Sequence, residues 1–432
     1  MFFASRALRQ SVCEKGFQIV SVVGFEPPVS ARDLCSIGAG ALGLGRSSVE
    51  RFETRLGELH GRGDAAAFGA GRVALAAILD ALKIGHDDEV IVPAYTCVAV
   101  PNPVLFCGAL PIYADVEARI PNIDIQSVRQ RLSARTRAVI VQHTFGYPID
   151  MRPFLALARE HGFALIEDCT HALGARYDGR VVGTFGDAAF YSFEQSKVIS
   201  TGQGGSAYSE DEAISRGIRD YQRRCQAPQS HQVSSLLVGL GMKAAFKGWG
   251  LSDRSRLPEY YLTRLGLISE AVTTEAEYRC ELPEAFAKAF SSRQAGLGVR
   301  QLDALEENLA ARRRIATRYF SSLEVPDDWL VHPEPEAAPA FLRFPLWVPD
   351  KQGLIDFARL RGVWIGNWFS APVHPLGVPQ DRAGYSVGDC PQAELAVARI
   401  ANLPCHPRMT DDDVDKVLRV VNEFAKRYAE ST

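Results

Sequence analysis

The sequence predicts an α/β protein with a large, mostly parallel sheet and a smaller C-terminal α+β domain. Apolar runs that read as short strands alternate with helical stretches through the first half of the chain, a pattern typical of parallel sheets with right-handed crossovers. The length of 432 residues suits about two domains. Hydrophobic residues at 47% and charged residues at 23% are ordinary for a globular protein.

Composition and charge favour some classes of protein over others. A net charge of −3 gives no electrostatic case for nucleic acid. The nine cysteines include no CxxC pair, which favours reduced thiols and a cytoplasmic protein. No charge-free apolar run is long enough for a transmembrane helix. Glu14 and Lys15 interrupt the N-terminal apolar stretch, so we interpret residues 1–25 as an extension rather than a signal peptide.

The first elements in the chain predict a helix, a glycine turn and a second helix. Ser48–Leu59 has a helical pattern, and Val73–Leu82 is rich in alanine and leucine. Between them, Gly69-Ala70-Gly71-Arg72 opens directly into the second helix. The unpaired N–H groups of such a helix start can hold a phosphate, although the same residues could form a plain tight turn.

Three buried strands and a helix are expected next. The strands are Glu89–Pro93, Leu110–Asp115 and Arg137–His143, and the helix is Val98–Cys107. Together they predict the parallel part of the sheet.

The stretch from Phe163 to Ser209 carries the candidate chemistry. Phe163–Asp168 is an apolar strand that ends in two carboxylates, and Asp187–Ser192 reads as a second strand. Lys197 follows, and then a glycine-rich turn. On its own, Asp168 would be more typical of a helix or turn cap, and Lys197 of a charge on the surface. Together, at two strand ends, a lysine and an acid suit pyridoxal phosphate (PLP), which needs a Schiff-base lysine and an acid for its pyridine nitrogen.

These motifs resemble the DegT/DnrJ/EryC1/StrS family of PLP-dependent sugar aminotransferases. The likeness is carried by Glu167–Ala175, Gly183–Asp187 and the Ser192-x-x-x-x-Lys197 spacing, and it covers roughly residues 45–225 and 291–428. It implies the PLP-dependent aminotransferase fold (fold type I). We expect an entry segment at 1–44, a large PLP-binding domain at 45–310 with an atypical insert at about 226–290, and a small domain at 311–432.

The resemblance also implies roles for single residues. Lys197 and Asp168 would be catalytic. Gly71, Arg72 and Ser192 would hold the cofactor phosphate, and His171 would contact the phenolic oxygen. His143, Trp368 and His374 would contact substrate, with His374 on the carboxylate of the amino donor. No metal is expected.

The chain departs from the family pattern at two places. Cys97 stands where the family has an aromatic that stacks on the cofactor, which leaves Tyr95 as the nearest replacement or a sulfur contact instead. The usual Asn and Arg of the contact between subunits fall near Ala287 and Ala289.

The resemblance implies a reaction in which an amino group moves from L-glutamate or glutamine to a nucleotide-linked keto-sugar. It also implies that the enzyme is a homodimer. Three alternatives stay open. A PLP sugar dehydratase of this fold would carry His in place of Lys197. A related PLP enzyme could act on a non-sugar carbonyl, and a non-catalytic binding protein could keep the fold alone.

The insert contains an apolar helical stretch, Leu236–Trp249, with Lys243 and Lys247 on one face. Extra packing is the plainer interpretation. The alternatives are that Arg254 and Arg256 border the acceptor entrance, or that the stretch touches a membrane surface.

The C-terminal part predicts helices and one strand. A long helix should run from Gln294 toward Tyr319, with a strand at Pro339–Val348 and a helix at Lys351–Arg361. Thr410 and Asp413 have the spacing of a capping box at the last helix.

Overall fold

The computed structural model describes residues 23–44, 48–61, 65–247 and 274–431. Its main sheet has seven strands in the order β1-β10-β9-β6-β5-β2-β4. These are β1 (Ala65–Phe68), β2 (Glu89–Pro93), β4 (Leu110–Ala114), β5 (Thr136–Gln142), β6 (Ala164–Asp168), β9 (Ala188–Ser192) and β10 (Gly205–Tyr208). The five strands from β4 to β9 are parallel, and β10 pairs antiparallel with both β9 and β1. The predicted mostly parallel sheet is confirmed.

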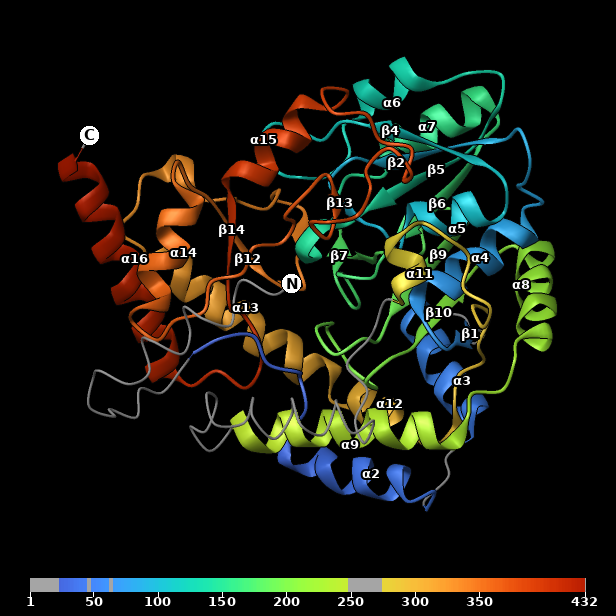
Figure 1. Ribbon diagram of the computed structural model, residues 1–432, viewed down its shortest axis with the longest axis horizontal. Coiled ribbons are helices and arrows are strands. Elements are labelled where there is room, and N and C mark those ends of the chain that lie inside the picture. The colour runs from blue at the N-terminus through green and yellow to red at the C-terminus, as the bar shows by residue number, and fades with distance from the viewer. Residues whose placement is uncertain (1–22, 45–47, 62–64, 248–273, 432) are drawn as a thin grey trace.

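The strands are apolar on both faces because helices cover both faces (Figure 1). In β2, Val90 and Val92 pack in one cluster with the helix at residues 71–81, whereas Ile91 packs in another with the helix at residues 152–161. The helices of this region are α3 (Val49–Leu59), α4 (Gly71–Ala81), α5 (Pro101–Phe106), α6 (Ile125–Arg131), α7 (Arg152–His161) and α8 (Glu212–Arg224). Helix α5 is shorter than expected because Pro101 is its first residue, where the missing N–H costs nothing.

The chain after the main sheet forms a second, smaller sheet. Strands β12 (Phe344–Trp347) and β14 (Ile400–Leu403) pair antiparallel. The helices around them are α12 (Ser292–Asp303), α13 (Leu305–Ser322), α14 (Lys351–Arg359), α15 (Pro391–Arg399) and α16 (Asp411–Ser431), with α16 at the far edge of the molecule (Figure 1). The single long helix expected from Gln294 is wrong, because the chain breaks at Ala304 between α12 and α13.

The capping box predicted for the last helix is present. The Asp413 N–H donates to Thr410 Oγ1 at 3.2 Å, and the Thr410 N–H donates to the Asp413 carboxylate at 2.9 Å. These bonds satisfy two N–H groups at the start of α16 and fix the position at which the helix begins.

The described part of the insert begins with α9 (Ser230–Lys247), which lies against α2 (Ala31–Ala41) at the edge of the molecule (Figure 1). Val233, Leu237 and Leu240 pack on Ile37 in a separate apolar cluster. The packing interpretation therefore holds for this helix. Trp249, Arg254 and Arg256 lie outside the described residues.

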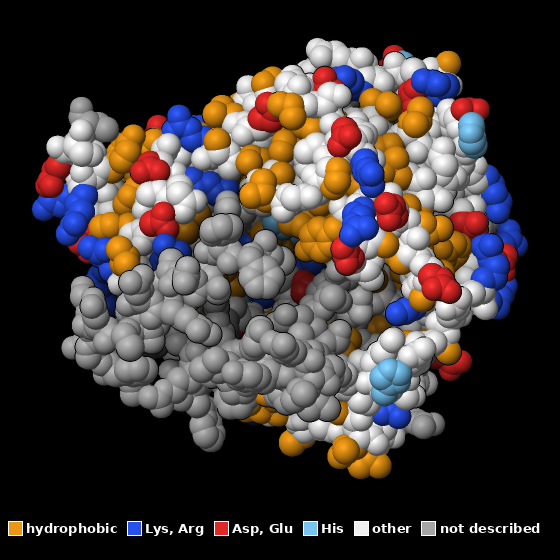
Figure 2. All heavy atoms as spheres, in the orientation of Figure 1, with side chains coloured by type: hydrophobic (Ala, Val, Ile, Leu, Met, Phe, Trp, Pro, Cys, Tyr) orange, Lys and Arg blue, Asp and Glu red, His pale blue; other side chains and the backbone are white. Residues whose placement is uncertain are grey.

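Short elements complete the fold. They are β3 (Thr96–Cys97), β7 (Arg176–Tyr177), β8 (Arg180–Val181), β11 (Ala337–Ala338), β13 (Val373–His374), α11 (Glu275–Tyr278) and two 3-10 turns, Thr144–Gly146 and Asp327–Trp329. None of the described helices is both long and apolar enough to cross a membrane. On the face in Figure 2, acidic and basic side chains are interspersed rather than gathered into one field.

Candidate active site

A cavity of about 310 Å³ lies at the carboxyl ends of β5, β6 and β9. Parallel strands end at one edge of a sheet, so side chains just past those ends converge there. All but one of the site residues expected from the sequence line this cavity: Gly71, Arg72, Cys97, Asp168, His171, Ser192, Lys197, Trp368 and His374.

Asp168 is the last residue of β6, and only 1% of it is exposed. Its register partners are Gln142 of β5 and Phe190 of β9, so the carboxylate sits in the middle of the strand ends. Burial raises the pKa of Asp168, although the hydrogen bonds from Thr170 and the charge of Lys197 act the other way. A cationic partner in the cavity would stabilise the ionised form of a carboxylate buried in this way.

Lys197 lies in the turn after β9. The turn is held by backbone bonds from Phe193 to Gly204 and from Lys197 to Glu194, at 2.9 and 3.1 Å. Burial lowers the pKa of Lys197, against the opposing charges of Glu194, Cys97 and Asp168. A lysine with a lowered pKa has a larger fraction of free amine at neutral pH, which is the form that reacts with a carbonyl.

The position of the proton on His171 follows from its hydrogen bonds. The Phe145 N–H donates to Nδ1 at 3.2 Å, so Nδ1 is unprotonated and Nε2 carries the proton. Phe145 makes this bond from the left-handed region, at φ 56°. Burial, followed by the charges of Lys197 and nearby cations, lowers the pKa of His171 well below its ordinary value. The ring is therefore a neutral donor, stacked on Trp368 with centroids 5.6 Å apart.

His374 reaches the cavity through the pairing of two short strands. β13 pairs with β3, which puts His374 beside Cys97. The Ser370 N–H donates to Nδ1 of His374 at 3.2 Å. Burial lowers the pKa of His374 to about 4, so this ring is also neutral near pH 7.

The glycine turn at the start of α4 brings backbone close to Ser192. A Cβ added to Gly71 would lie 3.1 Å from the Ser192 Cβ, and one added to Gly205 would lie 2.4 Å from the Gly71 Cα. No side chain caps α4. Backbone N–H groups at a helix start, together with the Ser192 hydroxyl, suit a phosphate group.

Arg72, at this helix start, forms an ion pair with Glu277 of α11. The side chain of Glu277 is 1% exposed, and its other oxygen accepts the Thr274 N–H at 2.7 Å. The next residue, Tyr278, lines the cavity. The insert therefore supplies part of the cavity wall through residues that the sequence analysis did not single out. No local pattern marks Tyr278, because its place depends on how α11 returns to the sheet.

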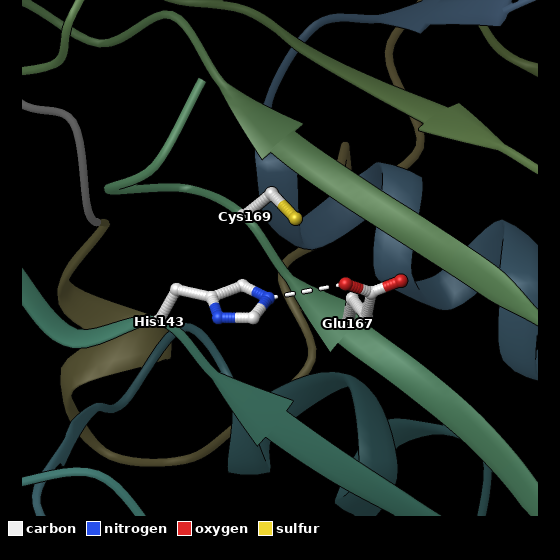
Figure 3. Close-up of side chains that lie close together, drawn as sticks. All are labelled: His143, Glu167 and Cys169. Atoms are coloured by element: carbon white, nitrogen blue, oxygen red, sulfur yellow. Dashed lines mark hydrogen bonds and ion pairs between the residues drawn. The ribbon is translucent and has the colours of Figure 1, made fainter. Parts of the chain in front are cut away.

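The structure corrects the expectation that His143 contacts the substrate. His143 is fully buried and is not among the residues that line the cavity. The Ile149 N–H donates to its Nδ1 at 3.2 Å, and its Nε2 donates to Glu167 at 3.1 Å (Figure 3). Both ring nitrogens are thus used inside the protein. His143 supports the carboxyl ends of β5 and β6 from behind the site.

His143, Glu167 and Cys169 lie close enough together to resemble a metal site (Figure 3). The Glu167 carboxylate, however, also accepts the N–H groups of Gly183, Phe185 and Gly186 at 2.7–2.8 Å. Burial would raise the pKa of Glu167, but the bonds from His143 and the backbone outweigh it and lower the pKa. The bonds of Glu167 to His143 and to the three backbone N–H groups form a hydrogen-bond network, which anchors β6, the strand that carries Asp168.

Tyr95 does not take the place of the stacking aromatic. It is fully buried, and its hydroxyl donates to the Trp368 carbonyl at 2.9 Å and accepts the Phe369 N–H at 2.8 Å. Cys97 itself faces the cavity instead. Tyr95 therefore positions the Trp368 segment.

The residues present fit PLP. The cavity has a lysine and a buried carboxylate, with a neutral imidazole donor beside them and a phosphate cradle at α4. These are the groups that this cofactor requires: an amine, an acid for the pyridine nitrogen, a donor for the phenolic oxygen and an anion site.

The chain is similar to known proteins over most of its length. The model of the DegT/DnrJ/EryC1/StrS aminotransferase family matches residues 37–245 and 272–422. The GDP-perosamine synthase of Caulobacter vibrioides is 30% identical over 383 residues, which are 88% of this chain and 90% of that protein. The UDP-N-acetyl-3-dehydro-alpha-D-glucosamine 3-aminotransferase of Acidithiobacillus ferrooxidans is 41% identical over 164 residues, which are 38% of this chain and 43% of that protein.

The fold is also found among solved structures. A Streptococcus pneumoniae protein assigned as a sugar aminotransferase, in its PLP form, superposes with a TM-score of 0.74 at 19% identity. The superposition covers 94% of this chain and 99% of that structure.

Proposed function

This chain belongs to the DegT/DnrJ/EryC1/StrS aminotransferase family and is a PLP-dependent transaminase, and we propose that it moves an amino group from L-glutamate to a nucleotide-linked keto-sugar. The observation that carries the proposal is the meeting of Lys197, Asp168 and His171 in one cavity, with the α4 cradle in its wall. The relatives named for GDP- and UDP-linked sugars point to the acceptor class.

When bound, PLP supplies an electron sink for the carbanion formed at the reacting carbon. The α4 N–H groups and Ser192 would hold its phosphate, and Asp168 would face its pyridine nitrogen. Asp168, when ionised, would favour the protonated form of that nitrogen. His171 would donate a hydrogen bond from its Nε2–H to the phenolic oxygen, and its ring would stay neutral.

Lys197 is the group that moves protons at the reacting carbon. Its lowered pKa raises the fraction of the free amine, which is the form that can act as a general base. A dehydratase of this fold carries His at the corresponding place, so the lysine favours transamination. Trp368 and Tyr278 line the cavity and would limit access of water.

A panel of nucleotide-sugar ketones with L-glutamate as donor tests the proposed reaction. We expect one class of ketone to be converted to an amine, with the product identified by NMR. The same panel should include non-sugar ketones and aldehydes, since conversion of only these would assign the chain to the alternative acceptor class.

Chemical labelling tests the role of Lys197 independently of the acceptor. Borohydride treatment of PLP-loaded protein should fix the cofactor to the peptide that contains Lys197. Label on a different lysine would show that the assignment is wrong, whatever the substrate panel gives.

A further inference from the structure

Glu194 is a carboxylate that the reaction described above does not use. It lies two residues after β9, in the turn that carries Lys197, and it lines the cavity. The other carboxylate among the residues that line the cavity is Asp168, which would face the pyridine nitrogen of PLP. A carboxylate withdrawn from water needs hydrogen-bond donors, so Glu194 calls for partners of its own.

The protein holds the Glu194 side chain by one oxygen. The N–H and the hydroxyl of Ser196 both donate to Oε2, at 3.0 and 2.5 Å. The other oxygen, Oε1, accepts no hydrogen bond from the residues that the structure describes. The next residue, Gln195, is not among the residues that line the cavity, and it bonds instead to Lys243 of α9 at 3.1 Å. The turn is therefore fixed from outside the cavity, and Oε1 of Glu194 is available to a ligand.

Glu194 lies close to the reacting group. The Lys197 N–H donates to the Glu194 carbonyl at 3.1 Å, so both residues belong to one tight turn, and both line the same cavity. Burial lowers the pKa of Lys197, and the charge of Glu194 is the largest of those that oppose this shift. A substrate whose reacting carbon meets Lys197 therefore brings the groups on its neighbouring carbons toward Glu194.

The chemistry of the two substrates decides which of them suits this oxygen. The carbon that reacts in L-glutamate carries a carboxylate, which Glu194 would repel. In a keto-sugar the carbons beside the ketone carry hydroxyl groups, which are neutral hydrogen-bond donors. An ionised carboxylate accepts hydrogen bonds and donates none, so it complements the hydroxyls.

We propose that Glu194 determines acceptor specificity by accepting a hydrogen bond from a hydroxyl next to the ketone of the sugar. The inference rests on the proposed function, because it concerns the acceptor of the same reaction. It adds a reason why the cavity would favour a sugar over a ketone without hydroxyls: such a ketone would leave Oε1 without a donor.

Glu194→Gln tests the inference with almost no change in shape. The amide keeps an oxygen for Ser196 and places an NH2 group where Oε1 was, which replaces the acceptor by a donor. We expect kcat/KM for the sugar ketone to fall about ten- to a hundredfold. An analogue without the hydroxyl next to the ketone should react equally well with the variant and the wild type. The half-reaction with L-glutamate should keep its KM.

Two further variants make the result specific. Glu160→Gln removes a carboxylate that is 61% exposed in α7, away from the cavity, and should change none of these values. Glu194→Ala removes both oxygens and should show the same selectivity between ketone and analogue. Because loss of the Glu194 charge lowers the pKa of Lys197 further, the comparison is made on the pH plateau of each variant.

Equal losses with the sugar ketone and with the analogue would overturn the inference. So would a higher KM for L-glutamate with an unchanged acceptor reaction. Conversion of no sugar ketone by the wild type would instead reject the acceptor class proposed above.

Binding of GDP-mannose and UDP-glucose, measured by calorimetry, keeps these two failures apart. Both carry an alcohol in place of the ketone and do not react, so their binding reports on Glu194 without turnover. At least one of them should bind about tenfold more weakly to Glu194→Gln than to the wild type. Equal binding by folded variant and wild type, or no binding by the wild type, would overturn the role of Glu194.

Discussion

The carboxylate of Asp168 is costly to bury in the protein without PLP, and we propose that the reaction requires it. Burial raises its pKa, so the ionised form depends on a cationic partner. We predict that Asp168→Asn lowers kcat about a hundred- to a thousandfold, since the proton on the pyridine nitrogen loses its counter-charge.

The same variant should not destabilise the protein without PLP, because the amide avoids the cost of burying a charge. Steady-state kinetics and thermal unfolding of the PLP-free protein check the two halves of this prediction. Near-normal turnover in Asp168→Asn would remove Asp168 from the catalytic groups.

His171 should act as a neutral donor over the whole working pH range. Its pKa lies well below the ordinary value because of burial and the neighbouring cations. The dependence of kcat on pH should therefore show no histidine titration between about pH 6 and 8. His171→Gln keeps a neutral N–H donor and should retain most activity, whereas His171→Ala should lose about tenfold or more. A titration in this range that disappears in His171→Gln would contradict the prediction.

Residues close together in sequence could be predicted, and residues brought in from afar could not. Lys197, Asp168 and Ser192 lie on neighbouring strand ends within one stretch, so the sequence indicated them. His143 occupies a similar strand end, but the side chain turns to Glu167 behind the sheet. Which way a residue past a strand end points depends on tertiary contacts that no local pattern encodes.

At the scale of elements, α11 links the insert to the cofactor cradle through the pair of Arg72 and Glu277. Both side chains are largely buried, so replacing Glu277 takes a close counter-charge away from a buried guanidinium. We predict that Glu277→Gln lowers the free energy of unfolding by about 3 kcal/mol at pH 7. Urea denaturation measures this difference.

A control lies two residues away on the same helix. Glu275 pairs with Arg279, and its side chain is 82% exposed. Glu275→Gln should change the free energy of unfolding by less than about 0.5 kcal/mol. If the two variants were equally stable, the Arg72–Glu277 pair would not hold α11 against the cradle.

The elements themselves were predictable to different degrees. Strands such as β2 and β6 matched their expected positions because apolar runs buried on both faces leave few alternatives. The expected strand at Pro339–Val348 was too long, since only β12 pairs with β14 there. Its ends depend on pairing with a strand more than fifty residues later, which a local pattern does not contain.

At the scale of the molecule, the division into domains stays a proposal, supported by the separation of the main sheet (residues 65–208) from the β12/β14 sheet (residues 344–403). The homodimer likewise rests on the family resemblance. The places where relatives are expected to carry a bridging Asn and Arg are near Ala287 and Ala289, whose short side chains cannot reach a partner. In the structure Ala289 forms a bridge with Phe68 at the end of β1, just before the α4 cradle.

Mixing two inactive variants tests whether a dimer would share its catalytic groups between subunits. Lys197 and Asp168 line the same cavity of a single chain. A mixed dimer of Lys197→Ala and Asp168→Ala subunits would therefore contain one defect in each site, and we expect it to stay inactive.

A mixed dimer of wild type with the doubly substituted subunit should keep about half of the activity of the wild-type dimer. Co-expression with two affinity tags gives both species, and light scattering gives their mass. Recovery of activity in the first mixture would show that Lys197 of one subunit works with Asp168 of the other, and a mass of one chain would rule out the dimer.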